Sequence, residues 1–240
     1  MFNKTKTKSA FTLAEVLITL VIIGVVAALT IPTAIGYYKK EETVSKLKKF
    51  YSTFGQAISR SIIDNGHYSN WDYDEIKSQQ GAFYFENNYI FPYLQVVKKC
   101  TPTSNECWAD NVRDAVIGEN LSIFKNSRLS SSSAVLSDGT SILICPRGSY
   151  LYIGIDINGH KSPNVVGRDV FTFYLTVKDG DTEFARDGSR AGFRPFMSNA
   201  THYSARDSVK QACASEVGTF CTGLIALDGW QIKSDYPHKL

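Results

Sequence analysis

The sequence lacks the short motifs that mark most catalytic and metal centres. Its 240 residues contain no Cys-x-x-Cys, His-Glu-x-x-His or Gly-x-Ser-x-Gly motif and no glycine-rich phosphate loop. The four histidines are scattered, with no spacing that suits a nucleophile and its base. The net charge of +3 is small and gives no broad basic surface for nucleic acid. These absences argue against an enzyme, a structural zinc site and a nucleic-acid partner.

What the sequence does have is one long apolar segment near its N-terminus. A basic ten-residue leader, Met1–Ala10, precedes an apolar run that extends from Phe11 to Gly36. This run of about 26 residues would be roughly 39 Å long as a helix, which is enough to span a bilayer. Glu15 is the only charged residue in the run. An acidic side chain inside a membrane is costly and usually functional.

The junction at the start of this run resembles the N-terminus of type IV prepilins and type II secretion pseudopilins. The matching residues are Ala10, Phe11, Thr12, Leu13 and Glu15, with alanine where the family usually has glycine. The resemblance implies that a prepilin peptidase cuts between Ala10 and Phe11 and methylates the new N-terminus of Phe11. It also implies that Glu15 neutralises the positive N-terminus of a neighbouring subunit during assembly.

The same resemblance implies a mechanical function. The chain would be a structural subunit of a type IV pilus or a type II secretion pseudopilus. Its partners would be other pilin or pseudopilin subunits, the inner-membrane assembly machinery and the membrane itself. Residues 1–10 would stay in the cytoplasm, and one inner-membrane crossing over residues 11–36 would leave the remainder outside. The sequence does not separate a major pilin, a minor pilin, a competence pilin and a pseudopilin.

Two other interpretations of the N-terminus remain. A secretory signal peptide would place a small-residue cleavage site after its apolar core, where Ala27–Leu29 and Thr33–Ala34 are weak candidates. A plain membrane anchor would not need Glu15. The alternative function is therefore a monomeric, membrane-anchored binding protein outside the cytoplasm, such as an adhesin.

Beyond the apolar run, the pattern predicts that the same helix continues to about Asp64. Apolar residues recur at helical steps of three and four. They are Val44, Leu47, Tyr51, Phe54, Ile58 and Ile62. We therefore expect an amphipathic continuation over residues 37–66 that docks on a globular domain, residues 67–240. Pro32 should kink the helix. By the family resemblance, the stretch from Gly24 to Pro32 can loosen in assembled filaments; the alternative is that both residues are simply tolerated in a membrane helix.

The globular domain is expected to complete an α+β, pilin-like fold in which an antiparallel sheet follows the long helix. Strands are predicted at 149–157 and 170–177, and as hairpins at 134–145 around Asp138-Gly139 and at 224–232 around Asp228-Gly229. Short helices are predicted near residues 71–79, 84–95 and 119–126. The serine run 130–133 is expected to be a surface loop.

The five cysteines fit an oxidising compartment. Cys100 lies near Cys107, and Cys213 lies near Cys221, so each pair could close a short loop. Spacing alone does not fix the connectivity. Cys145 falls in an apolar strand, where a buried thiol is expected.

One loop between two predicted strands is rich in oxygen donors. Its polar residues are Asp156, Asn158, Asn164 and Asp169. Hard oxygen ligands on such a loop suit Ca²⁺, and the pattern loosely resembles loops of prepilin-like proteins, some of which bind calcium. The loop is not an EF-hand, because Gly167 stands at the twelfth position instead of glutamate. The alternative is a turn held by its own hydrogen bonds, with no cofactor.

Overall fold

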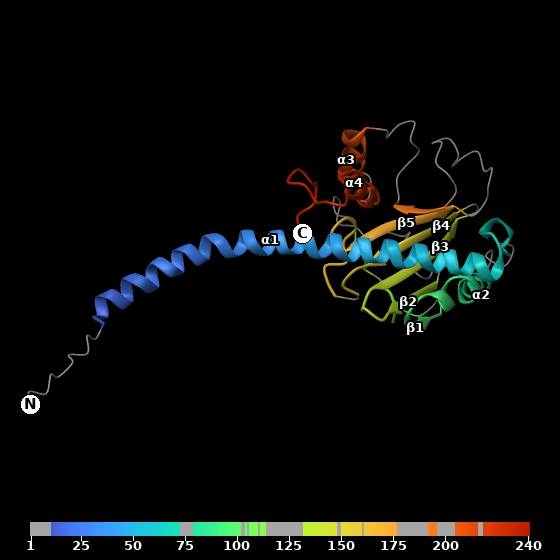
Figure 1. Ribbon diagram of the computed structural model, residues 1–240, viewed down its shortest axis with the longest axis horizontal. Coiled ribbons are helices and arrows are strands. Elements are labelled where there is room, and N and C mark those ends of the chain that lie inside the picture. Colours follow the sequence, from blue (N-terminus) through green and yellow to red (C-terminus); the bar gives the residue numbers. More distant parts are fainter. Residues whose placement is uncertain are drawn as a thin grey trace, which may run out of the picture. The chain divides into compact units, whose positions relative to one another are not determined.

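The computed structural model describes residues 11–72, 79–101, 104, 106–109, 111–113, 132–147, 150–159, 161–176, 192–195, 205–215 and 218–240. The chain divides into two compact units, Met1–Lys40 and Glu41–Leu240. The first unit contains the N-terminal part of helix α1, which runs from Leu13 to Asn65 (Figure 1). The second unit contains the remainder of α1 and the globular domain.

A six-stranded sheet forms the centre of the second unit. Its strands lie in chain order, and every neighbouring pair is antiparallel. They are β1 Val96–Cys100, β2 Ser132–Leu136, β3 Ser141–Arg147, β4 Tyr150–Asp156, β5 Val170–Thr176 and β6 Phe193–Pro195. A long N-terminal helix followed by this sheet is the α+β, pilin-like arrangement that the sequence predicts, so the fold prediction is confirmed.

The second half of α1 packs against one face of the sheet. Successive side chains of a strand point to opposite faces. Ile144 of β3 therefore belongs to the core shared with α1, while Cys145 belongs to a smaller cluster on the other face. Phe50 of α1 lies with its ring centroid 5.2 Å from that of Phe173 in β5. The sheet thus has one face covered by α1 and a second face that packs on loop residues such as Trp108 and Val166.

The apolar stripe predicted for α1 is the side of the helix that docks. Leu47 and Phe54 are fully buried, and Val44 and Ile58 are at most 6% exposed. Removing such a side chain from water contributes about 1.5–3 kcal/mol. The stripe is therefore enough to fix which side of α1 faces the sheet.

The predicted hairpin around Asp138-Gly139 joins β2 to β3, and β4 and β5 also lie where strands were expected. Gly139 has a φ of 83°, and the Thr140 N–H donates to Asp138 Oδ1 at 3.1 Å. A short polar residue followed by glycine supplies this geometry without strain.

The second predicted hairpin, at 224–232, is wrong, because Cys221–Leu227 form helix α4. Gly229, at a φ of 73°, and Trp230 donate their N–H groups back to carbonyls of the last helical turn at 3.0 and 2.8 Å. These two bonds form a Schellman cap. An aspartate–glycine pair supplies left-handed backbone both in hairpin turns and after helices, so the local pattern does not distinguish them.

The helix predicted at 84–95 is present, but it begins and ends earlier in the chain than expected. Helix α2 spans Gln79–Tyr89, and a 3-10 turn follows at Phe91–Tyr93. Pro92 stands in the first turn of that element, where its missing N–H is tolerated. The chain then enters β1, which the sequence analysis did not predict.

The serine run was also misassigned in part. Ser132 and Ser133 are fully buried in β2 rather than in a surface loop. Strand β6 and helix α3, Arg206–Ser215, were not predicted. The helix predicted at 119–126 and most of the one at 71–79 lie outside the described residues.

Two disulfides join the cysteines that are close in sequence. Cys100 is bonded to Cys107, and Cys213 is bonded to Cys221. Cys145 is buried in β3 outside both bridges. A bridge that closes a short loop typically contributes about 2–4 kcal/mol.

Glu86 of α2 is a buried carboxyl group without a hydrogen-bond partner among the described residues. Burial raises the pKa of Glu86 well above its usual value, which favours the neutral, protonated carboxyl group in the folded protein. The folded protein then binds a proton that the unfolded chain releases. Stability therefore falls as the pH rises above about 4.5 toward the folded pKa.

We expect Glu86→Met to stabilise the fold by about 1–3 kcal/mol at pH 7, because it removes an unsatisfied buried polar group. It should also flatten the loss of stability with rising pH. Denaturant unfolding at pH 5 and pH 8 measures both effects. Glu106→Gln is the control, because Glu106 is an exposed acid that pairs with Lys98 at the surface. A variant with the pH dependence of the unsubstituted protein would contradict this expectation.

Candidate functional site

The N-terminal end of α1 is closed by a capping box. The Thr12 N–H donates to Glu15 Oε2 at 2.8 Å, and the Glu15 N–H donates to Thr12 Oγ1 at 3.3 Å. The signature was visible in the sequence as Thr-x-x-Glu, although Glu15 is predicted above only as an assembly residue. Glu15 thus has a structural contact within its own subunit.

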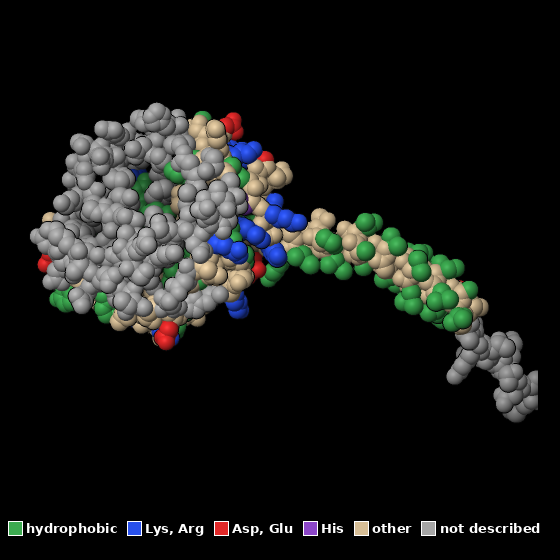
Figure 2. All heavy atoms as spheres, turned by 180° about the vertical axis from the view of Figure 1, so that it is seen from behind, with side chains coloured by type: hydrophobic (Ala, Val, Ile, Leu, Met, Phe, Trp, Pro, Cys, Tyr) green, Lys and Arg blue, Asp and Glu red, His purple; other side chains and the backbone are tan. Residues whose placement is uncertain are grey.

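After this cap, the first unit presents an apolar surface to its surroundings. Every Leu, Ile and Val side chain from Leu13 to Ile35 is 43–78% exposed. Figure 2 shows these side chains as a nearly continuous hydrophobic stretch. Helix α1 is long and apolar enough to cross a membrane, and an exposed apolar surface of this size indicates a lipid or protein partner. Pro32 lies within α1, which continues past it; the kink and the loosening after Gly24 stay predictions.

The second candidate site is the loop between β4 and β5, where the four predicted oxygen-bearing residues come together around Asp169. Asp169 Oδ1 accepts from the Val165 N–H at 2.6 Å. Its Oδ2 accepts from the Asn164 N–H at 2.9 Å and from Asn158 Nδ2 at 3.2 Å. Asp156, Asn164 and Asp169 are each at most 5% exposed. Asp169 is therefore the residue that holds the loop in its folded form.

Several oxygens of this loop face one another. Asn164 Oδ1 lies 3.1 Å from Asp156 Oδ2 and 3.0 Å from the Lys161 carbonyl oxygen, and it faces only acceptors. Asn158 Oδ1 is also buried without a partner among the described residues. Turning the Asn164 amide would let its nitrogen donate to both oxygens. Asn158 Oδ1 has no partner among the described residues in either orientation of that amide, and a cation would satisfy it.

The carboxyl group of Asp156 in this loop has a shifted pKa. Burial, together with the charge of Asp169, raises the pKa of Asp156 to about 8. The N–H groups of Asn158 and Gly159 and the charge of Lys46 act in the opposite direction but do not outweigh burial. Asp156 is therefore mostly neutral at pH 7, and a bound cation would favour its ionised form.

The C-terminal tail holds the far side of the same loop. The Tyr236 hydroxyl donates to Gly167 O at 2.6 Å. A Cβ at position 167 would lie 2.7 Å from His238 Cδ2 and 2.9 Å from Cys221 Sγ, and Gly167 has a φ of 84°. Glycine is thus required here both by backbone geometry and by the close approach of the tail.

Among the described residues, one cluster combines the ligand types of a transition-metal site. Ligand atoms of Cys213, Cys221 and His238 lie within 4.8 Å of one another. The two sulfurs are joined in a disulfide, however, and it is the thiolate that binds metal. His238 Nε2 also hydrogen-bonds with the Cys213 carbonyl at 2.9 Å. With Cys213 and Cys221 oxidised to a disulfide, the cluster has a structural role and offers no thiolate to a metal ion.

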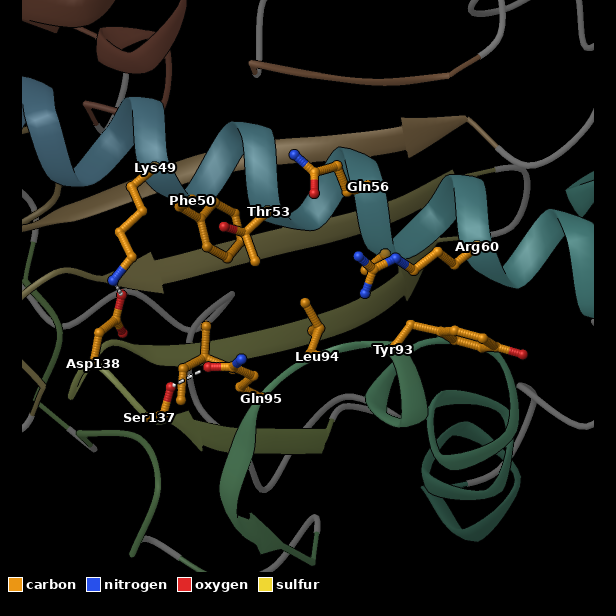
Figure 3. Close-up of a pocket in the computed structure, with 12 residues that line it drawn as sticks. Lys49, Phe50, Thr53, Gln56, Arg60, Tyr93, Leu94, Gln95, Ser137 and Asp138 are labelled. Carbon is orange, nitrogen blue, oxygen red and sulfur yellow. Dashed lines mark hydrogen bonds and ion pairs between the residues drawn. The ribbon is translucent and has the colours of Figure 1, made fainter.

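A groove of about 230 Å³ runs along the second half of α1 (Figure 3). Leu94 and Leu136 contribute apolar lining, and Lys49 pairs with Asp138 at 2.8 Å at one end. Arg60 extends from α1 into the groove at the other end (Figure 3). No histidine or cysteine is among the residues described around it, and nothing there pairs a nucleophile with a base. The groove gives no support to catalysis.

Comparison with known families assigns both parts of the chain. Residues 33–240 match the model of a family of unknown function, DUF6613, and residues 5–31 match the prokaryotic N-terminal methylation motif. No curated protein and no solved structure matches the chain. The motif is the prepilin-type cleavage and methylation segment that the residues around Phe11 suggested, and it identifies a precursor like those of type IV pilins and pseudopilins. The chain belongs to the family DUF6613 and begins with a prepilin-type N-terminus.

Proposed function

We propose that this protein is a structural subunit of a type IV pilus or a type II secretion pseudopilus and has no enzymatic activity. The observation that carries the proposal is the N-terminal methylation motif on a capped helix with an exposed apolar surface. A prepilin peptidase would cut between Ala10 and Phe11 and methylate Phe11. The product would then assemble with other pilin or pseudopilin subunits through the inner-membrane machinery.

The proposed organisation follows the expected boundaries. Residues 1–10 are the leader, 11–36 the segment for membrane and filament core, and 37–66 the amphipathic part of α1. Residues 67–240 form the domain outside the cytoplasm, and the inner membrane holds the subunit until it assembles. The compact globular unit begins at Glu41, which makes most of the amphipathic part of α1 an integral element of the domain.

Assembly would rest on the apolar part of α1. In the bilayer, lipid chains cover side chains that are otherwise 43–78% exposed. Once the helix leaves the bilayer, the same surface needs other apolar helices around it, since each exposed large side chain costs about 1.5–3 kcal/mol in water. A bundle of such helices with domains outside is the simplest arrangement that buries them.

Intact-mass measurement of the protein from cells tests the proposal. The mature chain should lack Met1–Ala10 and carry one added methyl group. An uncut, unmethylated chain that stays in the membrane would instead support the monomeric anchored binding protein. Cutting after the apolar run would support a secretory signal peptide.

Ala10→Leu should block this processing, because a peptidase site fitted to a small residue before the cut has no room for a branched side chain. The precursor should then accumulate at full mass in the membrane fraction. Ala34→Leu makes the same change away from the junction and should be processed normally. A normal N-terminus at Phe11 in the Ala10→Leu protein would overturn the assigned cut.

We also propose that the loop between β4 and β5 binds Ca²⁺ through the oxygens of Asp156, Asn158, Asn164 and Asp169. The support is that oxygen-bearing side chains gather in one buried loop, where Asn158 Oδ1 is buried without a hydrogen-bond partner among the described residues. Calcium takes six to eight oxygen ligands, so carbonyls or water would complete the shell. The ion would be structural and would leave the filament role unchanged.

A further inference from the structure

The apolar run of α1 is longer than a bilayer needs, so its composition alone does not say which part lies in the hydrocarbon. The hydrocarbon layer is about 30 Å thick, which corresponds to about 20 helical residues. The side chains at the two ends of the run, and the hydroxyl groups within it, fix the position more closely.

At the C-terminal end of the run, three consecutive side chains are of the kind that lie among lipid headgroups. Tyr37 and Tyr38 are 68% and 67% exposed, and the exposed Lys39 follows them. Tyrosines collect at membrane interfaces because the ring is apolar and the hydroxyl is polar, and lysine is attracted to anionic headgroups. Tyr37, Tyr38 and Lys39 therefore mark where the C-terminal end of the apolar run leaves the hydrocarbon layer.

Counting 20 residues back from Ile35, the last large apolar side chain before that boundary, gives the segment Val16–Ile35, which contains no charged residue. Within it, the Thr19 hydroxyl donates to Val16 O and the Thr30 hydroxyl donates to Val26 O, each at 2.9 Å. Polar groups in lipid must be satisfied within the helix, and these two of the segment's three threonine hydroxyls are.

The same count leaves Glu15 just outside the segment. Its carboxylate accepts hydrogen bonds from the N–H and hydroxyl of Thr12 at 2.8 and 2.9 Å. A capping box at headgroup depth keeps this acid hydrated and satisfies the first helical N–H groups, so a lone subunit does not have to carry a charge into lipid.

We propose that in the unassembled subunit the hydrocarbon layer covers Val16–Ile35. Glu15 then lies at one headgroup level, and Tyr37, Tyr38 and Lys39 lie at the other, against the phosphates of anionic phospholipids. The orientation of the helix, that is, which headgroup level faces the cytoplasm, rests on the proposed function. The depth of each residue in the bilayer does not rest on it. Glu15 enters an apolar environment only when the subunit joins a filament, so its need for a cationic partner arises at assembly rather than at insertion.

Depth-dependent fluorescence quenching tests this placement. Full-length protein is reconstituted in phosphatidylcholine–phosphatidylglycerol vesicles whose lipids carry bromine either near the chain ends or near the glycerol. Val26→Trp, at the centre of the segment, should be quenched several-fold more by deep bromine than Tyr37→Trp or Leu17→Trp. Those two edge variants should respond mainly to shallow bromine. Tyr84→Trp, in the globular domain, is the matched control and should respond to neither, as should the unsubstituted protein with its native tryptophans.

Deepest placement at Leu17→Trp would overturn the proposal, because the hydrocarbon would then include Glu15. Equal quenching of Tyr37→Trp and Val26→Trp by deep bromine would also overturn the proposal, because the hydrocarbon layer would then include Tyr37. Absence of quenching in all variants would also overturn it, since the helix would not be inserted. The experiment needs neither cleavage nor filaments, so each of these failures is distinguishable from failure of the filament function.

Discussion

Glu15→Leu is expected to leave the subunit in the membrane and to lower its incorporation into filaments by more than about tenfold. In a filament the positive N-terminus of the neighbouring subunit would lose its partner inside an apolar bundle, and an unpaired buried charge costs about 3–5 kcal/mol. In the unassembled subunit the substitution removes an acid near the membrane, which favours insertion. Comparing sheared or sedimented filaments with the membrane fraction measures both effects.

Glu15→Gln separates the two roles that Glu15 can have. Glutamine can still accept from Thr12 in the capping box, whose hydrogen bond to Glu15 is 2.8 Å long, but it carries no charge. Loss of incorporation in both variants supports charge pairing, whereas loss in Glu15→Leu alone would assign the effect to the helix cap. Unchanged incorporation in both would contradict the assembly role. For a minor subunit, the count of filaments per cell replaces the yield of the subunit itself.

Asp169→Ala is expected to destabilise the globular domain by about 3–5 kcal/mol in the presence of chelator. Asp169 accepts from the N–H groups of Asn164 and Val165, and both residues are buried. Each donor left without a partner costs about 1–3 kcal/mol. Asp138→Ala is the matched control, because Asp138 also caps a turn, at the N–H of Thr140, but takes no part in the candidate ion loop. Denaturant unfolding of the three proteins measures the difference.

Calcium adds a second arm to the same experiment. If Ca²⁺ binds the folded loop, it should stabilise the unsubstituted protein by about 2.7 kcal/mol at a hundredfold excess over its Kd. Asp156→Asn and Asp169→Ala should lose that gain, while Asp138→Ala keeps it. Equal stability with calcium and with chelator would contradict the calcium proposal and leave a loop held by its own hydrogen bonds.

The pH dependence of the calcium effect has a defined sign. Without a cation, Asp156 has a pKa of about 8 in the folded protein, well above its value in an unfolded chain. The folded state then binds the extra proton, so stability falls as the pH rises from about 4 to about 8. Calcium binding must release that proton, and its stabilising effect should therefore grow between pH 6 and pH 9. A calcium effect that is constant over this range would contradict binding at Asp156.

Features that depend on local order along the chain could be predicted from residue patterns alone. The apolar run after a basic leader and the three-and-four spacing from Val44 to Ile62 predicted α1 and its docking face. Apolar segments on either side of Asp138-Gly139 predicted the hairpin of β2 and β3. The motif at Phe11 predicted the family of the N-terminus. Each of these patterns either repeats every few residues or is only a few residues long, so it can be interpreted without knowing any contact that is distant in the chain.

Features that depend on what a segment packs against became visible only in the folded protein. The aspartate–glycine pair at 228–229 caps α4 because the segment folds against α3, to which the Cys213–Cys221 bridge ties it. Ser132 and Ser133 are buried because β2 lies between two other strands. The pKa of Glu86 is raised because its side chain is buried. A polar residue looks the same in a sequence whether it ends in solvent or in a core, since its burial is set by residues distant in the chain; only the packed fold settles which.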